Sequence, residues 1–417
     1  MRTTLRRHLT AVLRGAVVHA LALTFGALGR LALLRHGQTR PPAPDQVRRI
    51  LVIRLDLLGD VVMSLPAVRA LREHYPQARI TMLALPLARG LLEGCPDIDE
   101  ILTLDTNALR RPNTLLPALL AFLAMVRLLR ERRFDVAVSL SGRTASALAL
   151  LSGAPCRVGY RGEGYPYAFT LPVEGYRFHR LAHEVEYDLA LVRALGCPAG
   201  SRQPRLLVPE DARRYAATLV PQGGRPLIVL HPGATNGSAK RWPVDRWARL
   251  AVMLVQNGCR VALIGNSGDR GLTGQIVALA RSALPRSQQD SCAESEPATG
   301  VLIDLAGHTP HLLQLAALLE RATVLVSGDS GPAHIAVAVG CKLVEIFGPT
   351  DPRTYGPLDP EAIVLRAALP CSPCYDNTRP AECPFGNPIC MQLIGVEQVY
   401  QAVQEVLTRL PAAARPL

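Results

Sequence analysis

The chain has 417 residues, of which 49% are hydrophobic and 19% are charged. This is the composition of a globular protein, and it argues against both intrinsic disorder and a bundle of membrane-spanning helices. Because one hydrophobic core rarely organises a chain of this length, we expect two domains.

The net charge of +12 is concentrated near the N-terminus, where residues 1–50 hold nine arginines and a single acid, Asp45. An apolar run from Ala16 to Gly29 lies in this segment and stops at Arg30, short of the about 20 residues of a membrane span. No convincing cleavage site of a signal peptide precedes Arg30. We therefore expect residues 1–47 to form a helix that lies on a membrane surface, with a membrane span and an ordinary packed helix as the alternatives.

After residue 47 the sequence alternates β-branched runs with amphipathic stretches. This pattern predicts two helices, over 60–75 and 115–133, and strands over 48–55, 78–85, 100–105 and 135–140. Buried strands separated by helices indicate a parallel sheet covered on both faces, here over 48–205. The Gly- and Pro-containing stretch from Gly196 to Gly224 is expected to be a linker.

The alternation restarts over 222–395. It predicts strands over 226–233, 260–265, 301–307, 323–329 and 342–349, with helices near 244–257, 269–283, 310–321 and 331–340. A last helix with a short tail occupies 396–417. The fold class is therefore α/β, with two doubly wound, Rossmann-like domains, and the ligand site is expected in the crevice at the carboxyl ends of the strands.

The strand that ends at Ser327 leads into Gly328, Asp329, Ser330 and Gly331 and then into a helix. The free N–H groups and partial positive charge of such a helix start attract phosphate. His334, in the first turn, could donate a hydrogen bond to the same anion. The alternative is that Asp329 and Ser330 only cap the helix.

A second loop, 230–243, has Gly, Asn and Thr235 followed by Lys240 before the next helix. Two such loops in one domain favour a diphosphate site. A third strand end offers Asp269 for ribose hydroxyls or, equally, as a helix cap. The fingerprints of P-loop ATPases and of dinucleotide-binding dehydrogenases are missing from the sequence.

In the first domain, "DLLGDVV" follows the first strand and brings Asp60 to a helix start that faces the crevice. Asp60 could be an ordinary cap of that helix. Opposite a sugar-nucleotide site, its carboxylate could instead take the proton from an acceptor hydroxyl as that oxygen attacks the anomeric carbon.

Together, five segments resemble the bacterial lipopolysaccharide heptosyltransferases, glycosyltransferase family 9: "RLDLLGDVVMSLPAVRAL", "HEVEYDLALVRALG", "HPGATNGSAKRWP", "GDSGPAHIAVAVG" and "FGPTDP". The resemblance implies a GT-B architecture, an ADP-heptose donor in the second domain, an acceptor in the first, and inversion without a catalytic metal. It implies that Asp60 is the general base and Lys240 a diphosphate ligand. It also implies that Asp269 is an acidic contact near the ribose. The donor-phosphate loop that it implies consists of Asp329, Ser330, Gly331 and His334.

The C-terminal region contains four cysteines within twenty residues: Cys371, Cys374, Cys383 and Cys390. Their spacing is compatible with one tetrahedral structural metal. Four reduced thiols in a Pro-rich loop, or a disulfide, are the alternatives. The reaction itself is expected to need no cofactor.

The sequence thus predicts an inverting glycosyltransferase that moves heptose or a related sugar to a lipopolysaccharide core or similar lipid-linked glycan. We expect it to be peripheral at the cytoplasmic face of the inner membrane, with no nucleic-acid partner. One alternative is a non-catalytic, membrane-tethered nucleotide-sugar-binding protein, which would not need Asp60. The other is a nucleotide-sugar epimerase, for which a second pair of catalytic carboxylates is expected across the crevice.

Overall fold

The computed structural model describes residues 39–106, 108, 115–175, 182–198, 200–221, 223–234, 237–285, 301–375 and 382–410. The predicted membrane-surface helix within 1–47 therefore lies almost wholly outside the described residues. Within the described ranges, no helix is both long enough and apolar enough to cross a bilayer.

The first domain is built on a parallel sheet of six strands in the order β3-β2-β1-β4-β5-β6. Its strands are β1 (Arg49–Arg54), β2 (Arg79–Ala84), β3 (Glu100–Thr103), β4 (Val136–Ser139), β5 (Cys156–Tyr160) and β6 (Leu171–Val173). Its helices are α2 (Leu58–His74), α3 (Arg89–Leu92), α4 (Leu115–Arg132), α5 (Gly142–Leu151) and α6 (Glu184–Arg193), with short 3₁₀ turns η1 (Pro44–Gln46), η2 (Pro86–Ala88) and η5 (Pro166–Ala168).

The central strand of this sheet is apolar on both faces because helices cover both. Ile50 and Val52 of β1 pack in the cluster that contains α2 and α6, whereas Leu51 and Ile53 pack in the cluster that contains α4 and α5. Successive side chains of a strand point to opposite faces, so a continuous apolar run is what a doubly covered strand requires.

The second domain repeats the plan, with strand order β12-β11-β10-β7-β8-β9 and only parallel pairs. Its strands are β7 (Leu227–His231), β8 (Arg260–Leu263), β9 (Leu302–Asp304), β10 (Val324–Gly328), β11 (Lys342–Phe347) and β12 (Ile363–Arg366). Its helices are α7 (Glu210–Leu219), α8 (Val244–Gln256), α9 (Arg270–Ala283), α11 (Leu312–Arg321), α12 (Gly331–Ala338), α13 (Pro352–Tyr355), α14 (Ile389–Gln392) and α15 (Val396–Arg409), with 3₁₀ turns η7 (Ser238–Lys240) and η8 (Ser267–Asp269).

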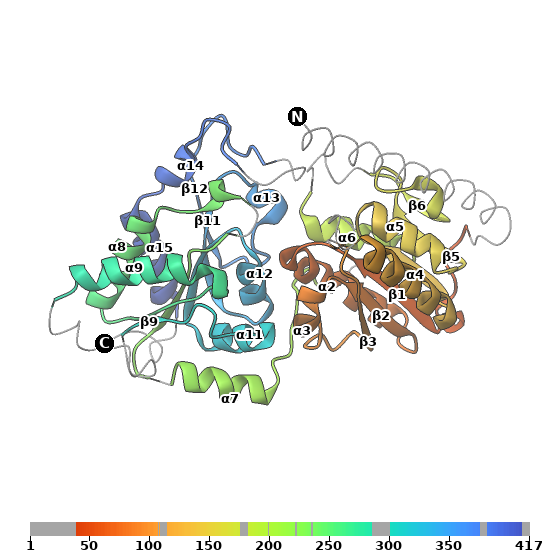
Figure 1. The fold of residues 1–417 in the computed structure, drawn as a ribbon, viewed down its shortest axis with the longest axis horizontal. Coiled ribbons are helices and arrows are strands. Elements are labelled where there is room, and N and C mark those ends of the chain that lie inside the picture. Colours follow the sequence, from red (N-terminus) through yellow and green to blue (C-terminus); the bar gives the residue numbers. More distant parts are fainter. Residues whose placement is uncertain are drawn as a thin grey trace.

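The two domains lie side by side, and α2, α3 and α6 of the first face α11, α12 and α13 of the second (Figure 1). One apolar cluster runs across this boundary, since it contains Leu91 and Leu92 from α3 together with Leu313 and Leu315 from α11. The boundary therefore places the starts of α2 and α12 against each other.

The predicted fold class is confirmed, and all nine predicted strands are present. Sequence analysis did not predict β5, β6 and β12, which have only three to five residues each. It was wrong to treat 196–224 as linker throughout, because α7 forms within it and packs on α11. The outer limits 48–205, 222–395 and 396–417 stay predictions.

Candidate active site

Each sheet has a topological switch point, at which successive strands are added on opposite sides of the central strands. In the first sheet β1 lies between β2 and β4, and in the second β10 and β7 are neighbours. Ligands of doubly wound folds bind in the crevice outside the carboxyl ends of such central strands. A ligand is therefore expected near the segments that follow β1, β7 and β10.

The segment after β1 brings Asp60 into the first turn of α2. The helix begins at Leu58, and its N-cap is Leu57, whose side chain makes no capping hydrogen bond. Asp60 is thus the third residue of the helix, so it does not stand at the N-cap position itself. Its side chain is 25% exposed, which leaves the carboxylate reachable from the crevice.

Below Asp60 lies Arg54, the last residue of β1, which is completely buried. Its guanidinium nitrogens lie 2.9 Å from Asp188 Oδ1, 3.0 Å from Glu184 Oε1, 3.0 Å from Asp56 Oδ2 and 3.6 Å from Asp60 Oδ1. Burial would lower the pKa of Arg54, but the surrounding carboxylates raise it above its ordinary value. The cation is therefore permanent, and it ties the start of α2 to α6.

On the opposite side, Ser330 is the N-cap of α12, yet its hydroxyl makes no capping bond. The hydroxyl instead contacts Ser327 Oγ at 2.8 Å and His231 Nδ1 at 3.2 Å. The main-chain N–H groups of the first turn are thus not capped by Ser330, which favours the anion-binding interpretation over the cap alternative.

His334 lies in the first turn of α12 and is 6% exposed. Burial lowers the pKa of His334 to about 4, although the nearby charge of Asp329 acts in the opposite direction. The imidazole is therefore neutral near pH 7, so it can offer an anion a ring N–H but no positive charge.

Lys240, at the end of η7, forms an ion pair with Asp329, whose Oδ2 is 2.7 Å from Nζ. Both side chains are nearly buried, with 12% and 10% of their surface exposed, and Nζ lies 4.9 Å from the ring centre of Tyr375. Burial alone would raise the pKa of Asp329, but the charge and hydrogen bond of Lys240 outweigh it and lower the pKa. Lys240 therefore stands at the start of α12 as the cation that an anionic ligand would meet.

The two helix starts meet closely. A methyl group on Gly59 would lie 2.8 Å from His334 Cδ2, so only glycine lets α2 approach the imidazole. A second link crosses the boundary at His183, where Nε2 donates to the Gly356 carbonyl at 2.9 Å. The start of α2, which includes Asp60, thus packs against the first turn of α12.

Comparisons with known proteins identify the family of the chain. The family profile "Glycosyltransferase family 9 (heptosyltransferase)" matches residues 122–384. Lipopolysaccharide heptosyltransferase 2 of Escherichia coli is 33% identical over 339 residues, which cover 76% of this chain and 88% of that protein. The chain belongs to glycosyltransferase family 9. It is therefore a glycosyltransferase of the heptosyltransferase family, as its motifs predict.

Solved structures of the family share the fold. The structure of E. coli ADP-heptose lps heptosyltransferase II superposes with a TM-score of 0.65 at 27% identity, covering 87% of this chain and 99% of that one. A glycosyl transferase family 9 protein from Veillonella parvula gives 0.69 at 22% identity, covering 89% and 99%. The predicted GT-B architecture is thus confirmed.

The segment that follows β8 also carries polar groups. Asp269 accepts a hydrogen bond from the Asn266 N–H at 2.9 Å, as a helix-cap carboxylate does. A Cβ atom added to Gly233 would lie 3.1 Å from His231 Nε2 and 3.2 Å from the Asp269 oxygens, so the two polar side chains lie together against Gly233. Burial lowers the pKa of His231 to about 4, which makes it a neutral donor or acceptor.

Glu345 is the most unusual acid near the site. It lies in β11 opposite Ser327, is fully buried, and has no hydrogen bond to either carboxyl oxygen within the described part of the chain. Burial, and then the charge of Asp329, raise the pKa of Glu345 well above its usual range. Burial thus favours the uncharged form of this carboxyl, which lies near the Lys240–Asp329 pair.

Sequence analysis missed Arg54, His231 and Glu345 as site residues. A charged residue within each of the apolar strand sequences "RILVIR" and "KLVEIF" was the available signal for Arg54 and Glu345. Thr235, which was predicted to bind the donor, lies outside the described residues.

Of the four C-terminal cysteines, Cys371 and Cys374 are exposed, Cys383 is half-buried and Cys390 is buried. Among the residues that the structure describes, no group of three or more His, Cys, Asp or Glu side chains is arranged to hold a metal ion. A structural metal at the four cysteines is therefore unsupported.

Proposed function

We propose that this protein transfers a heptose from ADP-heptose to a lipopolysaccharide core acceptor, with inversion at the anomeric carbon. The relatives that are named lipopolysaccharide heptosyltransferase 2 support the sugar and the acceptor class. One observation carries the catalytic part. Gly59, the residue before Asp60, packs directly against the His334 ring of α12, which supports an assignment of Asp60 to the reaction at the donor phosphates.

Asp60 acts as the general base in this proposal. An acceptor hydroxyl attacks the anomeric carbon, its proton passes to the Asp60 carboxylate, and the bond from the anomeric carbon to the diphosphate oxygen breaks. The electron pair of that bond leaves with the diphosphate. Arg54, 3.6 Å from Asp60, holds the carboxylate in position and stays charged throughout.

The departing diphosphate gains charge, and the second domain supplies groups that can stabilise it. Lys240 contributes a cation, the first turn of α12 contributes N–H groups at Ser330 and Gly331, and His334 contributes a neutral ring N–H. Lys240 must then turn at least partly from Asp329 to the diphosphate. Asp329 is therefore a partner that holds Lys240 ready in the absence of donor.

The adenosine part of the donor is assigned to the surface that follows β7 and β8. His231 and Asp269 lie there beside Gly233, and their polar atoms suit ribose hydroxyls. Asp269 would serve both the start of α9 and the ribose, so the two interpretations of its carboxylate are compatible.

A lipid-linked acceptor requires the enzyme to work at a membrane surface. We assign the protein to the cytoplasmic face of the inner membrane as a peripheral protein. The basic and apolar residues in 1–47 support attachment there, because arginine binds anionic headgroups and an apolar helix face enters the acyl region.

The proposal is tested by incubating the full chain with heptose-deficient lipopolysaccharide core and ADP-heptose, and measuring the mass of the acceptor. We expect a gain of one heptose with ADP-heptose and none with UDP-glucose as the matched control. Donor binding without acceptor modification would favour the binding-protein alternative. Conversion of the donor without any acceptor would favour the epimerase alternative.

A further inference from the structure

Helix α4 is apolar on two opposite sides, and only one of them is needed for the core. Ala118, Met125 and Leu129 point into the first domain and are at most 9% exposed. The other side carries four leucines at helical spacing: Leu116, Leu119, Leu120 and Leu123, which are 66%, 38%, 58% and 54% exposed. A contiguous exposed row of this kind is uncommon on a soluble surface and marks an interaction site.

The row lies at the edge of the sheet that carries the candidate active site. β3 ends at Thr103 at the carboxyl edge of the sheet, and α4 starts from that edge and runs back along it. The leucines occupy the first turns of α4. They are therefore at the same carboxyl edge of the sheet as the start of α2, where Asp60 lies, but on the opposite face of the sheet.

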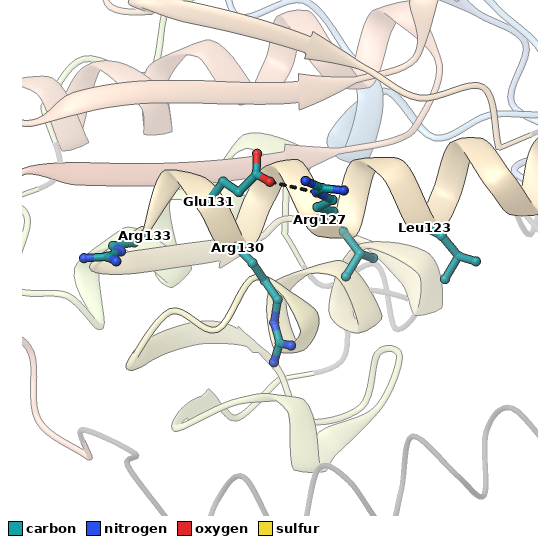
Figure 2. Close-up of a pocket in the computed structure, with 6 residues that line it drawn as sticks. Leu123, Arg127, Arg130, Glu131 and Arg133 are labelled. Carbon is teal, nitrogen blue, oxygen red and sulfur yellow. Dashed lines mark hydrogen bonds and ion pairs between the residues drawn. The ribbon is translucent and has the colours of Figure 1, made fainter.

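The second half of the same helix is basic. Arg127 and Arg130 follow the leucines, Arg133 comes directly after the end of the helix, and Arg127 pairs with Glu131 at 2.8 Å. A hollow of about 610 Å³ runs along this part of the surface, and its lining residues are Leu123, Val126, Arg127, Arg130, Glu131 and Arg133. Figure 2 shows that Leu123 and Arg130 extend to the same side of the helix, so leucine and arginine side chains share one face.

We propose that this outer face of α4, the leucine row with the adjoining arginines, docks on an anionic lipid bilayer. Leucines enter the acyl boundary, while arginines keep their guanidinium groups among phosphate headgroups and lay their stems against the apolar region. Charge complementarity selects a bilayer over an apolar protein groove, because phosphate headgroups offer anions to the exposed guanidinium groups of Arg127 and Arg130 and an apolar groove offers none. The inference rests on the proposed function, to which it adds the orientation: the crevice edge faces the surface that presents a lipid-linked acceptor.

The native tryptophans make a direct test possible. Trp242 and Trp247 are 2% and 1% exposed and lie in the second domain, so lipid-borne quenchers do not reach them. A tryptophan introduced by Leu120→Trp in the full chain would report on α4. Leu279→Trp is the matched control, because Leu279 is 45% exposed on α9, at the far end of the molecule from α4 (Figure 1).

The experiment uses vesicles of phosphatidylethanolamine and phosphatidylglycerol, with and without bromine on the acyl chains. We expect brominated lipid to quench the emission of Leu120→Trp and to leave that of Leu279→Trp unchanged. Replacing Leu120 and Leu123 by serine should weaken vesicle binding about tenfold for each leucine. Arg130→Gln should reduce binding to anionic vesicles and leave weak binding to phosphatidylcholine vesicles unchanged.

Three results would overturn the proposal. Vesicle binding without quenching of Leu120→Trp would mean that another segment alone attaches the protein. Emission from Leu120→Trp that is already blue-shifted without lipid and insensitive to bromine would mean that this chain covers α4 itself. Emission that shifts with protein concentration instead of lipid would mean that a second copy covers it. The same variants should transfer heptose to a soluble, deacylated core acceptor at the wild-type rate. A wild-type protein that transfers no heptose to this acceptor would count against the proposed function instead.

Discussion

The ion pair between Lys240 and Asp329 can be tested with two variants that should differ in stability but bind the donor equally weakly. Replacing Lys240 by methionine leaves the Asp329 carboxylate about nine-tenths buried without its cation. Breaking a buried pair in this way costs about 3–5 kcal/mol, and we expect the lower end, about 3 kcal/mol, because both side chains keep some contact with water. The double variant Lys240→Met/Asp329→Asn removes both charges and should recover most of that stability.

Donor binding should behave differently. Both variants lack the cation that meets the diphosphate, and a charge-assisted contact is worth about 1.5–3 kcal/mol, so each should bind ADP-heptose about ten- to a hundredfold more weakly. Urea unfolding and calorimetric titration with ADP-heptose measure the two quantities on the same preparations. Equal stability of the single and double variants would refute the stabilising role of the pair. Wild-type affinity in both would refute the contact with the donor.

The pH dependence of this pair has a definite sign. Lys240 lowers the pKa of Asp329 below its ordinary 3.8, so the stability that the pair contributes is present above pH 3.8 and is lost as the pH falls through the lower folded value. In Lys240→Met, burial is the main remaining influence and disfavours the charged form. The gap in stability between wild type and Lys240→Met should therefore narrow as the pH falls below 7.

Two further predictions concern the neighbours of this pair. The pKa of Glu345 is raised in the folded state, so its carboxyl contributes stability below its ordinary pKa of 4.5 and this contribution is lost as the pH rises. The stability of Glu345→Gln relative to wild type should therefore increase above pH 4.5, by up to about 1.4 kcal/mol per pH unit. Urea unfolding between pH 5 and 8 measures this difference, and parallel stability curves would contradict the assignment. Gly59→Ala puts a methyl group 2.8 Å from the buried His334 ring and should lower the stability of the fold by about 1–3 kcal/mol. Gly90→Ala is the control, because a methyl group there meets nothing within 4 Å and should not destabilise the protein. Equal melting temperatures of the two variants would contradict the close contact.

Much of the fold was predictable because apolar period and turn residues agree along the chain. The strand around 323–329 and the helix after Gly331 were expected within one or two residues of β10 and α12. Shorter elements escaped notice for physical reasons. β6 has three half-buried residues and includes Pro172, which cannot donate to a sheet, and α7 is so polar that its residues resemble a linker until α11 covers one side.

The candidate site was only partly predictable. Loops that follow strands pointed to Asp60, Lys240 and the Asp329 segment. A single loop of this kind can be an ordinary helix cap, but two of them in one domain favoured a diphosphate site. Partners were not predictable, since they depend on contacts between distant segments. No spacing in the sequence indicates that Arg54 meets Asp188, 134 residues away, or that His334 lies against Gly59.

The central claim is that Asp60 removes the acceptor proton, and the single-turnover transfer rate of Asp60→Asn tests it most directly. General-base catalysis contributes about 10²–10⁴-fold, so the account predicts a rate lower by that factor, with ADP-heptose affinity and melting temperature near wild type. Asp56→Asn is the matched control, because Asp56 also pairs with Arg54, at 3.0 Å, and is 32% exposed but is not assigned the proton. A folded Asp60→Asn protein that transfers heptose at the wild-type rate would contradict the account.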